Sequence, residues 1–220
     1  MDSESSRTSS DAIYARGDVV AGKYQLVRLL GEGGMGSVWV CKNLALEVHV
    51  ALKLIKRDTS SSEAAHRLLT EARAAARLCH ASIVKIYDFG STDRDDPFIV
   101  MELLAGDSLA ALIDDRGRLG AMEAVRTLLP VVSGLAVAHE EGVVHRDMKP
   151  DNVMLVPQPG GIVVPKIVDF GIAKLHRDEP PTRATTAGTV LGSPDYMSPE
   201  QARGRDDVDE RADVWALSVM

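Results

Sequence analysis

Runs of β-branched and aromatic residues, separated by polar residues and glycine, dominate the first half of the chain after residue 24. Short runs of this kind, bounded by turn-forming residues, are typical of β-strands. A glycine-rich segment joins the first two runs, and a segment rich in Asp, Ser and Pro joins the last two. The pattern predicts five strands, at residues 24–30, 36–40, 48–55, 83–89 and 98–103.

Helical spacing of apolar positions appears once within this half and then dominates the second half. Residues 60–78 carry apolar side chains three and four positions apart, which predicts a helix. After Gly106 the pattern predicts helices at 108–115 and 121–141, with Pro130 a potential kink in the second. A hairpin is then predicted, with strands at 153–156 and 163–168.

These elements divide the chain into three parts. Residues 1–23 are rich in polar residues and predict a flexible leader. Residues 24–104 predict a β-rich lobe with one main helix, and residues 105–220 a mainly helical lobe. The fold class is therefore α+β, with two lobes.

Composition narrows the choice of function. The chain has 220 residues, 45% of them hydrophobic, which is enough for a substantial core. A formal net charge of −7 and the lack of a basic run argue against nucleic acid as a partner. No apolar run reaches the roughly 20 residues of a membrane span, so none is expected. Cys41 and Cys79 lack the spacing of disulfides or metal ligands and are expected to be buried free thiols in a reducing cytoplasm.

The glycine-rich segment has the spacing Gly31-x-Gly33-x-x-Gly36-x-Val38. Glycines let the backbone approach phosphate groups closely and present N–H donors to them. Taken alone the pattern is weak, because many tight turns contain three glycines. A dinucleotide-binding fold needs a helix directly after the glycines, and a strand-like run follows instead. A hairpin lid over a nucleotide fits better.

A lysine within the third predicted strand is the next candidate. Lys53 has apolar neighbours, which would point its ammonium group into a cleft and require a counter-charge. Glu71, on the predicted helix, is the candidate partner. The alternative is a solvated surface lysine, the usual environment of that residue.

The strongest signals follow in the second lobe. Residues 145–152 read His-Arg-Asp-Met-Lys-Pro-Asp-Asn, and Asp169-Phe170-Gly171 follows the predicted hairpin. With the glycine segment, Lys53 and Glu71, these motifs resemble the signature set of eukaryotic-like (Hanks-type) protein kinases. The resemblance covers residues 24–220 and implies the bilobal protein kinase fold.

The resemblance also implies the role of each residue. Asp147 would accept or orient the proton of the substrate hydroxyl, Lys149 would steady the γ-phosphate, and Lys53, oriented by Glu71, would hold the α- and β-phosphates of ATP. Asn152 and Asp169 would hold Mg²⁺. The implied ATP-binding residues are Gly31, Glu32, Gly33, Gly34, Met35, Gly36, Val38, Ala51, Lys53, Met101, Glu102 and Leu104. Glu102 and Leu104 would act through their backbone groups, although a simple core strand would show the same pattern.

Specificity and regulation are implied in the same way. Lys149 is typical of the serine/threonine branch, so the expected substrates are serine and threonine hydroxyls of proteins. The segment from Gly171 to Glu200 resembles an activation loop, with Thr185, Thr186 and Thr189 as candidate phosphorylation sites and Arg146 as the phosphate receiver. Those threonines could equally be solvated loop residues. Gly-Glu-Gly-Gly-Met-Gly-Ser-Val-Trp and Tyr-Met-Ser-Pro-Glu-Gln most resemble bacterial members.

The end of the chain departs from the family pattern. Residues 213–220 resemble the start of the central helix of the larger lobe, and family members continue with several more helices. The resemblance therefore predicts a C-terminally truncated catalytic domain, with Trp215, Leu217 and Val219 exposed. Two alternatives to an active kinase stay open: a catalytically weak ATP-binding scaffold and a non-functional fragment. A homodimer formed through the small lobe is a further open alternative.

Overall fold

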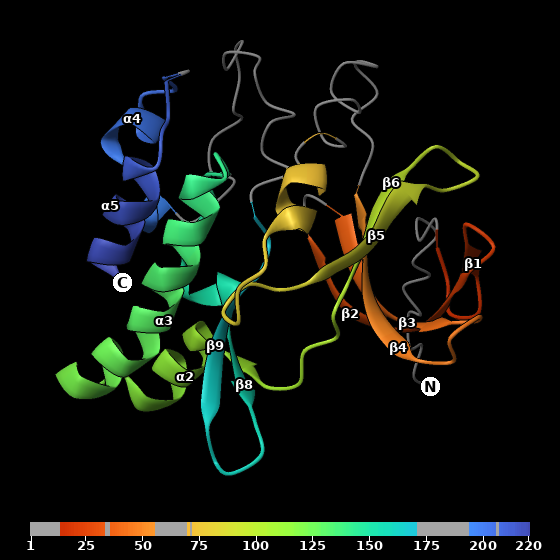
Figure 1. Cartoon of the computed structure of the whole chain (residues 1–220), viewed down its shortest axis with the longest axis horizontal. Helices are drawn as coiled ribbons and strands as arrows, with labels where there is room; N and C mark the ends of the chain where they lie inside the picture. The colour runs from red at the N-terminus through yellow and green to blue at the C-terminus, as the bar shows by residue number, and fades with distance from the viewer. Residues whose placement is uncertain (1–13, 34–35, 56–69, 71, 171–193, 206) are drawn as a thin grey trace, which may run out of the picture.

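The structure is a computed structural model that describes residues 14–33, 36–55, 70, 72–170, 194–205 and 207–220. The chain forms two lobes that lie side by side, a small sheet-based lobe and a larger lobe in which helices surround a second sheet (Figure 1). The small sheet has six strands in the order β1-β2-β3-β4-β6-β5, all antiparallel to their neighbours. Its strands are β1 (Val19–Val20), β2 (Tyr24–Gly33), β3 (Gly36–Asn43), β4 (His49–Ile55), β5 (Ile86–Ser91) and β6 (Pro97–Met101).

Alternating side chains give this sheet two apolar faces. One face packs into a cluster that contains Leu26, Cys41, Leu52 and Val100, all almost fully buried. The other face packs Ala51, Ile55 and Ile99 against Ala72, which belongs to the helical residues 72–77. The five predicted strands and the end of the predicted helix are therefore present, because a period of two residues lets each strand bury both of its faces.

The predicted leader is wrong at its C-terminal end. Val19 and Val20 pair with Gln25 and Tyr24 of β2 and add a sixth strand. Further upstream, the Tyr14 hydroxyl donates to Asp96 at 2.6 Å, on the turn between β5 and β6. Residues 14–23 thus belong to the small lobe.

The predicted fourth strand is also too long at its start. β5 begins at Ile86, whereas Ile83 forms a parallel bridge with Ile167 of the larger lobe. The apolar run from Ile83 is therefore shared between the lobes, because its first residues pair with the second sheet and its later residues with β6.

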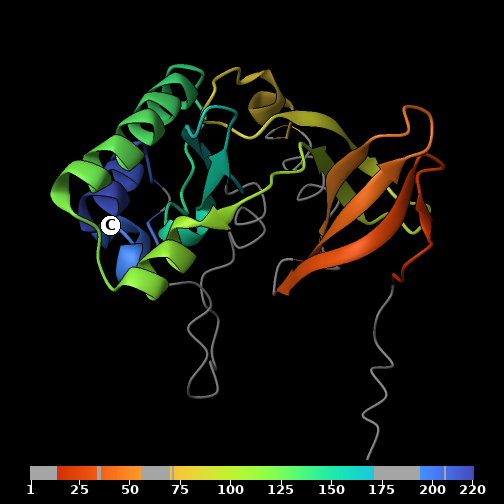
Figure 2. The same cartoon turned by 90° about the horizontal axis from the view of Figure 1, so that it is seen from below.

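The larger lobe buries its core between helices and a small three-stranded sheet, ordered β7-β8-β9. Val131, Leu135, Met148, Ile167 and Ala216 form the centre of that core. Its elements are β7 (Asp107–Ser108), α2 (Leu109–Arg116), α3 (Ala121–Glu140), η1 (Pro150–Asn152), β8 (Val153–Pro157), β9 (Val163–Ile167), η3 (Pro194–Tyr196), α4 (Pro199–Ala202) and α5 (Arg211–Val219). Figure 2 shows α3, α5 and α4 grouped on the side away from the small lobe.

Local signals set the ends of the helices. The Ser108 hydroxyl accepts the Ala111 N–H at 3.1 Å and caps α2, and Gly117, with φ +75°, ends it. α4 begins with a capping box between Ser198 and Gln201. α3 continues through Pro130 as a single helix.

Among the described residues, one helix, α3, is long enough and apolar enough to cross a membrane, judged by length and composition alone. Core helices of soluble proteins meet the same criterion. α3 packs Val131, Leu135 and Ala138 into the core of the larger lobe, whereas Met122, Val125, Leu129 and Val132 of the same helix are exposed.

Two expectations about burial need correction. Cys41 is buried as expected, but Cys79 is exposed because it follows the last helical turn before His80. On α5, Trp215 and Val219 are exposed as expected, whereas Leu217 is partly buried against the core.

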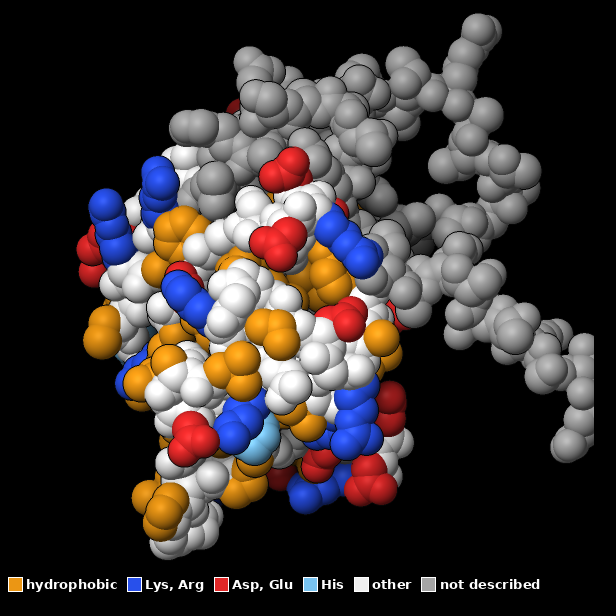
Figure 3. Space-filling model, turned by 90° about the vertical axis from the view of Figure 1, so that its right-hand side faces the viewer, with side chains coloured by type: hydrophobic (Ala, Val, Ile, Leu, Met, Phe, Trp, Pro, Cys, Tyr) orange, Lys and Arg blue, Asp and Glu red, His pale blue; other side chains and the backbone are white. Residues whose placement is uncertain are grey.

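Figure 3 shows the molecule from the side of the small lobe. On the described part of this face, Lys and Arg side chains lie scattered among acidic and apolar ones and do not gather into a basic patch. The arrangement agrees with the net charge of −7.

Candidate active site

The glycine hairpin is built by β2 and β3, whose pairing continues to Gly33 opposite Gly36. Gly36 has φ +139°, and a Cβ atom there would overlap the carbonyl oxygen of Leu54 on β4. Only glycine fits this position, since it combines an unusual backbone conformation with close contact to the next strand. Gly31, Glu32 and Gly33 are exposed at the end of the hairpin, as a lid over phosphates requires, whereas Gly34 and Met35 lie outside the described residues.

Lys53 lies on β4 and points toward the larger lobe. Its side chain is 14% exposed, and its Nζ is 2.7 Å from Oδ1 of Asp169. The alternative of a solvated surface lysine is therefore wrong. Glu71, the expected partner of Lys53, lies outside the described residues. The structure thus pairs Lys53 of β4 with Asp169, which lies 116 positions later in the chain.

The catalytic loop is folded around Asn152. Its Nδ2 donates to the backbone carbonyl of Asp147 at 2.7 Å and lies 3.5 Å from the Asp147 carboxylate. The Asn152 carbonyl accepts the N–H of Val168, the residue directly before Asp169, at 3.0 Å. Asn152 therefore links Asp147 by hydrogen bonds to Val168, the residue directly before Asp169.

Asp213 on α5 fixes the start of that loop. Its Oδ2 accepts the His145 N–H and its Oδ1 accepts the Arg146 N–H, both at 2.8 Å, and Nε2 of His139 donates to Oδ2 at 2.8 Å. The Asp213 side chain is 1% exposed. Arg146 has φ +62°, a conformation that costs a non-glycine residue about 1–3 kcal/mol and persists only when neighbours impose it. Asp213 imposes it by taking both N–H groups.

Sequence reasoning missed Asp213. The signal available was a carboxylate within the otherwise apolar run of residues 212–219. An acidic side chain on the buried face of a helix needs donors, and the preceding motif supplies them.

His145 has a structural role in the catalytic loop and is not placed to act as a base. It is completely buried and its ring packs against Phe170, with 4.9 Å between ring centroids. Nδ1 accepts the N–H of Asp147 at 3.2 Å, and Nε2 donates to the carbonyl of Val168 at 3.0 Å. These contacts require the neutral ring. Burial lowers the pKa of His145, and the opposing influence of Asp213 does not offset it.

Asp169 also has an unusual backbone, with φ +57°. Its side chain is 37% exposed, so the carboxylate faces the cleft while one oxygen holds Lys53. Strained residues of this kind cluster at functional sites, where the surrounding structure over-determines them. The site lies between β4 of the small lobe and the loop after β9 of the larger lobe.

The segment that joins the lobes begins at Met101, the last residue of β6, which is buried opposite Ala51 of β4. The next residue, Glu102, is partly buried and its N–H donates to the carbonyl of Lys85 at 2.9 Å. Leu104 is partly buried beside the same cluster as Ala51 and Met101. Val38 of β3 pairs with Lys53. The predicted adenine-side residues therefore converge on the edge of the cleft.

Arg146 is tied to the segment that follows the candidate activation loop. Its carbonyl accepts Nε2 of Gln201 at 2.7 Å, and its own Nε is buried without a hydrogen-bond partner among the described residues. Thr185, Thr186 and Thr189 lie outside the described residues.

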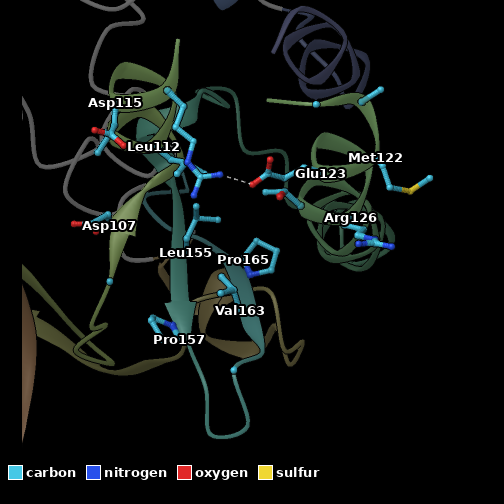
Figure 4. A pocket seen from close by; sticks show the side chains of 17 residues that line it. Asp107, Leu112, Asp115, Met122, Glu123, Arg126, Leu155, Pro157, Val163 and Pro165 are labelled. Atoms are coloured by element: carbon cyan, nitrogen blue, oxygen red, sulfur yellow. Dashed lines mark hydrogen bonds and ion pairs between the residues drawn. The ribbon is translucent and has the colours of Figure 1, made fainter. Parts of the chain in front are cut away.

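A large cavity lies elsewhere on the larger lobe. It has a volume of about 1140 Å³ between α2, α3 and the β8–β9 hairpin. Arg116 and Glu123 both line it and form an ion pair at 2.8 Å, and Figure 4 shows Glu123 among the lining side chains. Of the predicted catalytic and metal residues that the structure describes, none lines this cavity.

The arrangement of Lys53, Asp147, Asn152 and Asp169 can be compared with known proteins. The profile of the family described as "Protein kinase domain" matches residues 24–220, most of the chain. The chain belongs to the protein kinase family.

Similar curated proteins are bacterial. The kinase is 41% identical over 207 residues to "Serine/threonine-protein kinase pkn3" of Myxococcus xanthus. The aligned region covers 93% of this chain and 38% of the relative. It is 38% identical over 209 residues to "Serine/threonine-protein kinase PknA" of Mycobacterium tuberculosis, with 93% of this chain and 47% of the relative covered. The chain thus spans less than half the length of these two relatives.

The fold is shared with solved kinase domains. The crystal structure of the Mycobacterium tuberculosis PknI kinase domain matches with a TM-score of 0.73 and 31% identity, covering 93% of this chain and 74% of that one. The expectation of an α+β protein kinase fold of the bacterial Hanks type is confirmed.

Proposed function

We propose that this kinase transfers the γ-phosphate of ATP to serine and threonine hydroxyls of proteins, with Mg²⁺ as cofactor. The observation that carries the proposal is the hydrogen-bond network that joins Asp147 to Asn152 and to Val168, beside the Lys53–Asp169 ion pair. Phosphoryl transfer depends mainly on positioning and on charge neutralisation, and this network supplies both.

Each residue of the site has a separate role in the proposed reaction. Asp147 accepts or orients the proton of the attacking hydroxyl, and Asn152 holds the Asp147 backbone in place at 2.7 Å. Lys53 brings a positive charge into the cleft for the phosphates of ATP. Lys149, two residues after Asp147, is partly exposed and available to the γ-phosphate.

The residues present fit Mg²⁺. Asp169 offers a carboxylate on the cleft side and Asn152 an amide oxygen, and hard oxygen donors of these kinds are the ligands that Mg²⁺ prefers. When bound, Mg²⁺ neutralises the charge that gathers on the phosphate oxygens during transfer. Asp169 has φ +57°, and one of its carboxylate oxygens pairs with Lys53.

The preference for serine and threonine rests on two supports. Lys149 follows Asp147 at the spacing typical of that branch of the family. The relatives are themselves named serine/threonine kinases, including PrkC of Bacillus subtilis at 38% identity over 205 residues.

Regulation, location and assembly are further parts of the proposal. The buried Nε of Arg146 supports its role as receiver for a phosphate on Thr185, Thr186 or Thr189, since a charge-assisted contact would satisfy it. A cytoplasmic location is supported by the two free cysteines. A homodimer stays a prediction, which light scattering at several protein concentrations would test.

The central experiment compares the unsubstituted chain with Asp147→Asn in γ-labelled ATP, Mg²⁺ and a generic basic protein. Loss of the carboxylate should reduce transfer by roughly 100-fold or more, because a positioned base contributes about that much. Asp151→Asn is the matched control, since Asp151 is an exposed carboxylate of the same loop, and it should transfer phosphate normally.

Two outcomes would contradict the proposal. Stabilisation by ATP in thermal unfolding without any transfer would identify a nucleotide-binding scaffold, because ligand binding raises apparent stability without chemistry. Neither stabilisation nor transfer would identify a chain that is inactive by itself.

A further inference from the structure

Glu102 is predicted to bind ATP through its backbone, and its side chain forms an ion pair at the hinge between the lobes that this role does not use. Oε1 of Glu102, the first residue after β6, accepts Nζ of Lys166 at 2.7 Å and the backbone N–H of Lys85 at 2.9 Å. The backbone of Glu102 makes a second bond to Lys85, since its N–H donates to the Lys85 carbonyl at 2.9 Å. Glu102 is therefore held through both its backbone and its side chain.

The partners of Glu102 come from both sides of the hinge. Lys166 lies on β9 in the sheet of the larger lobe, and Lys85 directly precedes β5 of the small sheet. The segment before Lys85 is docked on β9 as well. The carbonyl of Ile167 accepts the Val84 N–H at 3.0 Å, and the Ile167 N–H donates to Ser82 at 2.8 Å. The Glu102–Lys166 pair thus closes a connection between β9 and the chain that leaves β6.

Burial makes this pair unlike a surface salt bridge. Lys166 is 9% exposed as a residue, and the side chains of Lys166 and Glu102 are 11% and 18% exposed. Lysine is rarely buried unless it is paired. A surface pair such as Lys42–Glu47, at 3.5 Å, is screened by water and contributes little. A buried pair restricts the positions of both side chains, because a buried charge that loses its partner is strongly destabilised.

Among the described residues, the Lys53–Asp169 ion pair and the His139–Asp213 hydrogen bond also have a strongly buried member, and both lie at the catalytic centre. The Glu102–Lys166 pair lies at the hinge instead. Nothing in the catalytic network uses Lys166, whose neighbour Ile167 is part of the core.

We propose that Lys166 is a positioning residue for nucleotide binding: through Glu102 it holds the peptide at residues 101–104 in the geometry that receives the adenine ring. The proposal rests on the proposed ATP-dependent function. Nζ of Lys166 pairs with Glu102 at the hinge and not with Asp147, Asn152 or Asp169, so its proposed effect is on the purine end of the nucleotide. Removal of the pair lets the hinge peptide adopt several conformations, and nucleotide binding must then select one of them.

The test uses the full 220-residue chain and three variants. Lys166→Met keeps the length of the side chain and removes its charge. Glu102→Gln keeps an acceptor for the Lys85 N–H and removes the ion pair. Lys166→Arg keeps the charge and serves as the conservative rescue. Lys42→Met is the matched control, because it breaks an exposed ion pair on the outer side of the small sheet.

The dissociation constants of ADP and of adenosine are measured by displacement of a fluorescent ADP analogue, and KM for ATP and kcat are measured with a basic protein substrate. In Lys166→Met both dissociation constants and KM should rise by about tenfold, which corresponds to roughly 1.4 kcal/mol of binding free energy. The factor should be the same for ADP and adenosine, because the purine end is affected, and kcat should change by less than about twofold. Lys166→Arg and Lys42→Met should bind as the unsubstituted chain does.

A double variant sharpens the result. Lys166→Met combined with Glu102→Gln should bind nucleotide as weakly as either single variant, because the second change has no ion pair left to break. If Lys166→Met does not fold, Glu102→Gln and Lys166→Arg carry the same comparison, since both keep hydrogen-bonding groups at the buried positions.

Equal dissociation constants for the unsubstituted chain and the folded variants would overturn the positioning role. So would parallel losses of kcat, binding and folded fraction, which would indicate a purely structural pair. A chain that binds no nucleotide before any substitution would contradict the proposed function itself, and that result differs from one in which binding is normal and insensitive to Lys166.

Discussion

Replacement of Asp213 should separate nucleotide binding from phosphate transfer. Asp213 does not belong to the ATP-binding set, yet it holds the catalytic loop through the N–H groups of His145 and Arg146. Asp213→Ala leaves those two donors without their acceptor in a site where Asp213 is 1% exposed. Each buried unsatisfied donor costs about 1–3 kcal/mol, so two cost roughly 2–6 kcal/mol.

The loop then has a further reason to move. Asp213 helps to hold Arg146 at φ +62° through its N–H, and release of roughly 1–3 kcal/mol of backbone strain favours a relaxed loop. Asp147, the next residue, would move with it. The destabilisation is large against a typical total stability of about 5–15 kcal/mol.

Asp213→Asn is the informative companion. The asparagine side chain has one oxygen and one amide nitrogen, whereas His145 and Arg146 each present a donor to a different carboxylate oxygen. Either orientation of the amide sets its NH₂ group against one of these N–H groups. The isosteric change should therefore fail to rescue the loop, although it preserves size and polarity.

The measurements are urea unfolding, nucleotide binding and transfer to a basic protein. Trp39 lies in the core of the small sheet and Trp215 on α5, so single-tryptophan versions report the two lobes separately. Both Asp213 variants should lose transfer at least about 100-fold and destabilise the α5 side. Binding of ADP should persist in the fraction that stays folded, since the small-lobe contacts are unchanged.

Asp209→Asn is the control, because Asp209 is a more exposed carboxylate just before the same helix and should change stability by less than about 0.5 kcal/mol. Transfer within about twofold of the unsubstituted chain in Asp213→Ala, or full recovery in Asp213→Asn, would refute the reasoning.

Two further predictions concern titration and thiol chemistry. Burial lowers the pKa of His145 in the folded state below its ordinary 6.5, so the unfolded chain binds more protons below that pH. The free energy of unfolding should fall by up to about 1.4 kcal/mol per pH unit as pH drops below about 6.5, and His145→Phe should flatten that slope in urea titrations. An unchanged slope would contradict the assignment. Burial raises the pKa of the Cys41 thiol to about 12, whereas Cys79 is exposed. Iodoacetamide at pH 8 should label Cys79 in the native protein and reach Cys41 only in urea, as peptide mass mapping would show.

Local pattern was enough to predict most of the elements. The β2–β3–β4 meander follows from alternating apolar residues around a glycine turn, and α2 follows from the Ser108 cap and the Gly117 stop. The two-residue strand β1 carries too little pattern to stand out in a polar leader. Its pairing with β2 appears only in the folded sheet.

The residues of the candidate active site could be predicted from the sequence, whereas the residues that support them could not. Lys53, Asp147, Asn152 and Asp169 sit in motifs whose short-range spacing is recognisable. Asp213 and Lys166 act on residues 64 to 68 positions away, at Glu102, Arg146 and His145. Contacts between residues so far apart produce no recognisable motif in the sequence. The one sequence feature that indicates them is a charged residue within an apolar run.

Those two supports share a physical logic. Apolar packing fills space, but it does not select one backbone conformation among several of similar volume, whereas a buried charge accepts only the geometry that satisfies it. The catalytic loop needs a left-handed residue at Arg146, and the hinge needs one peptide orientation after Met101. In each place a buried charge, Asp213 or Lys166, holds backbone or side-chain groups that come from distant parts of the chain. Loss of either should therefore impair one function specifically, transfer for Asp213 and purine affinity for Lys166, while a volume-conserving change in the apolar core around Leu135 should weaken both together through stability.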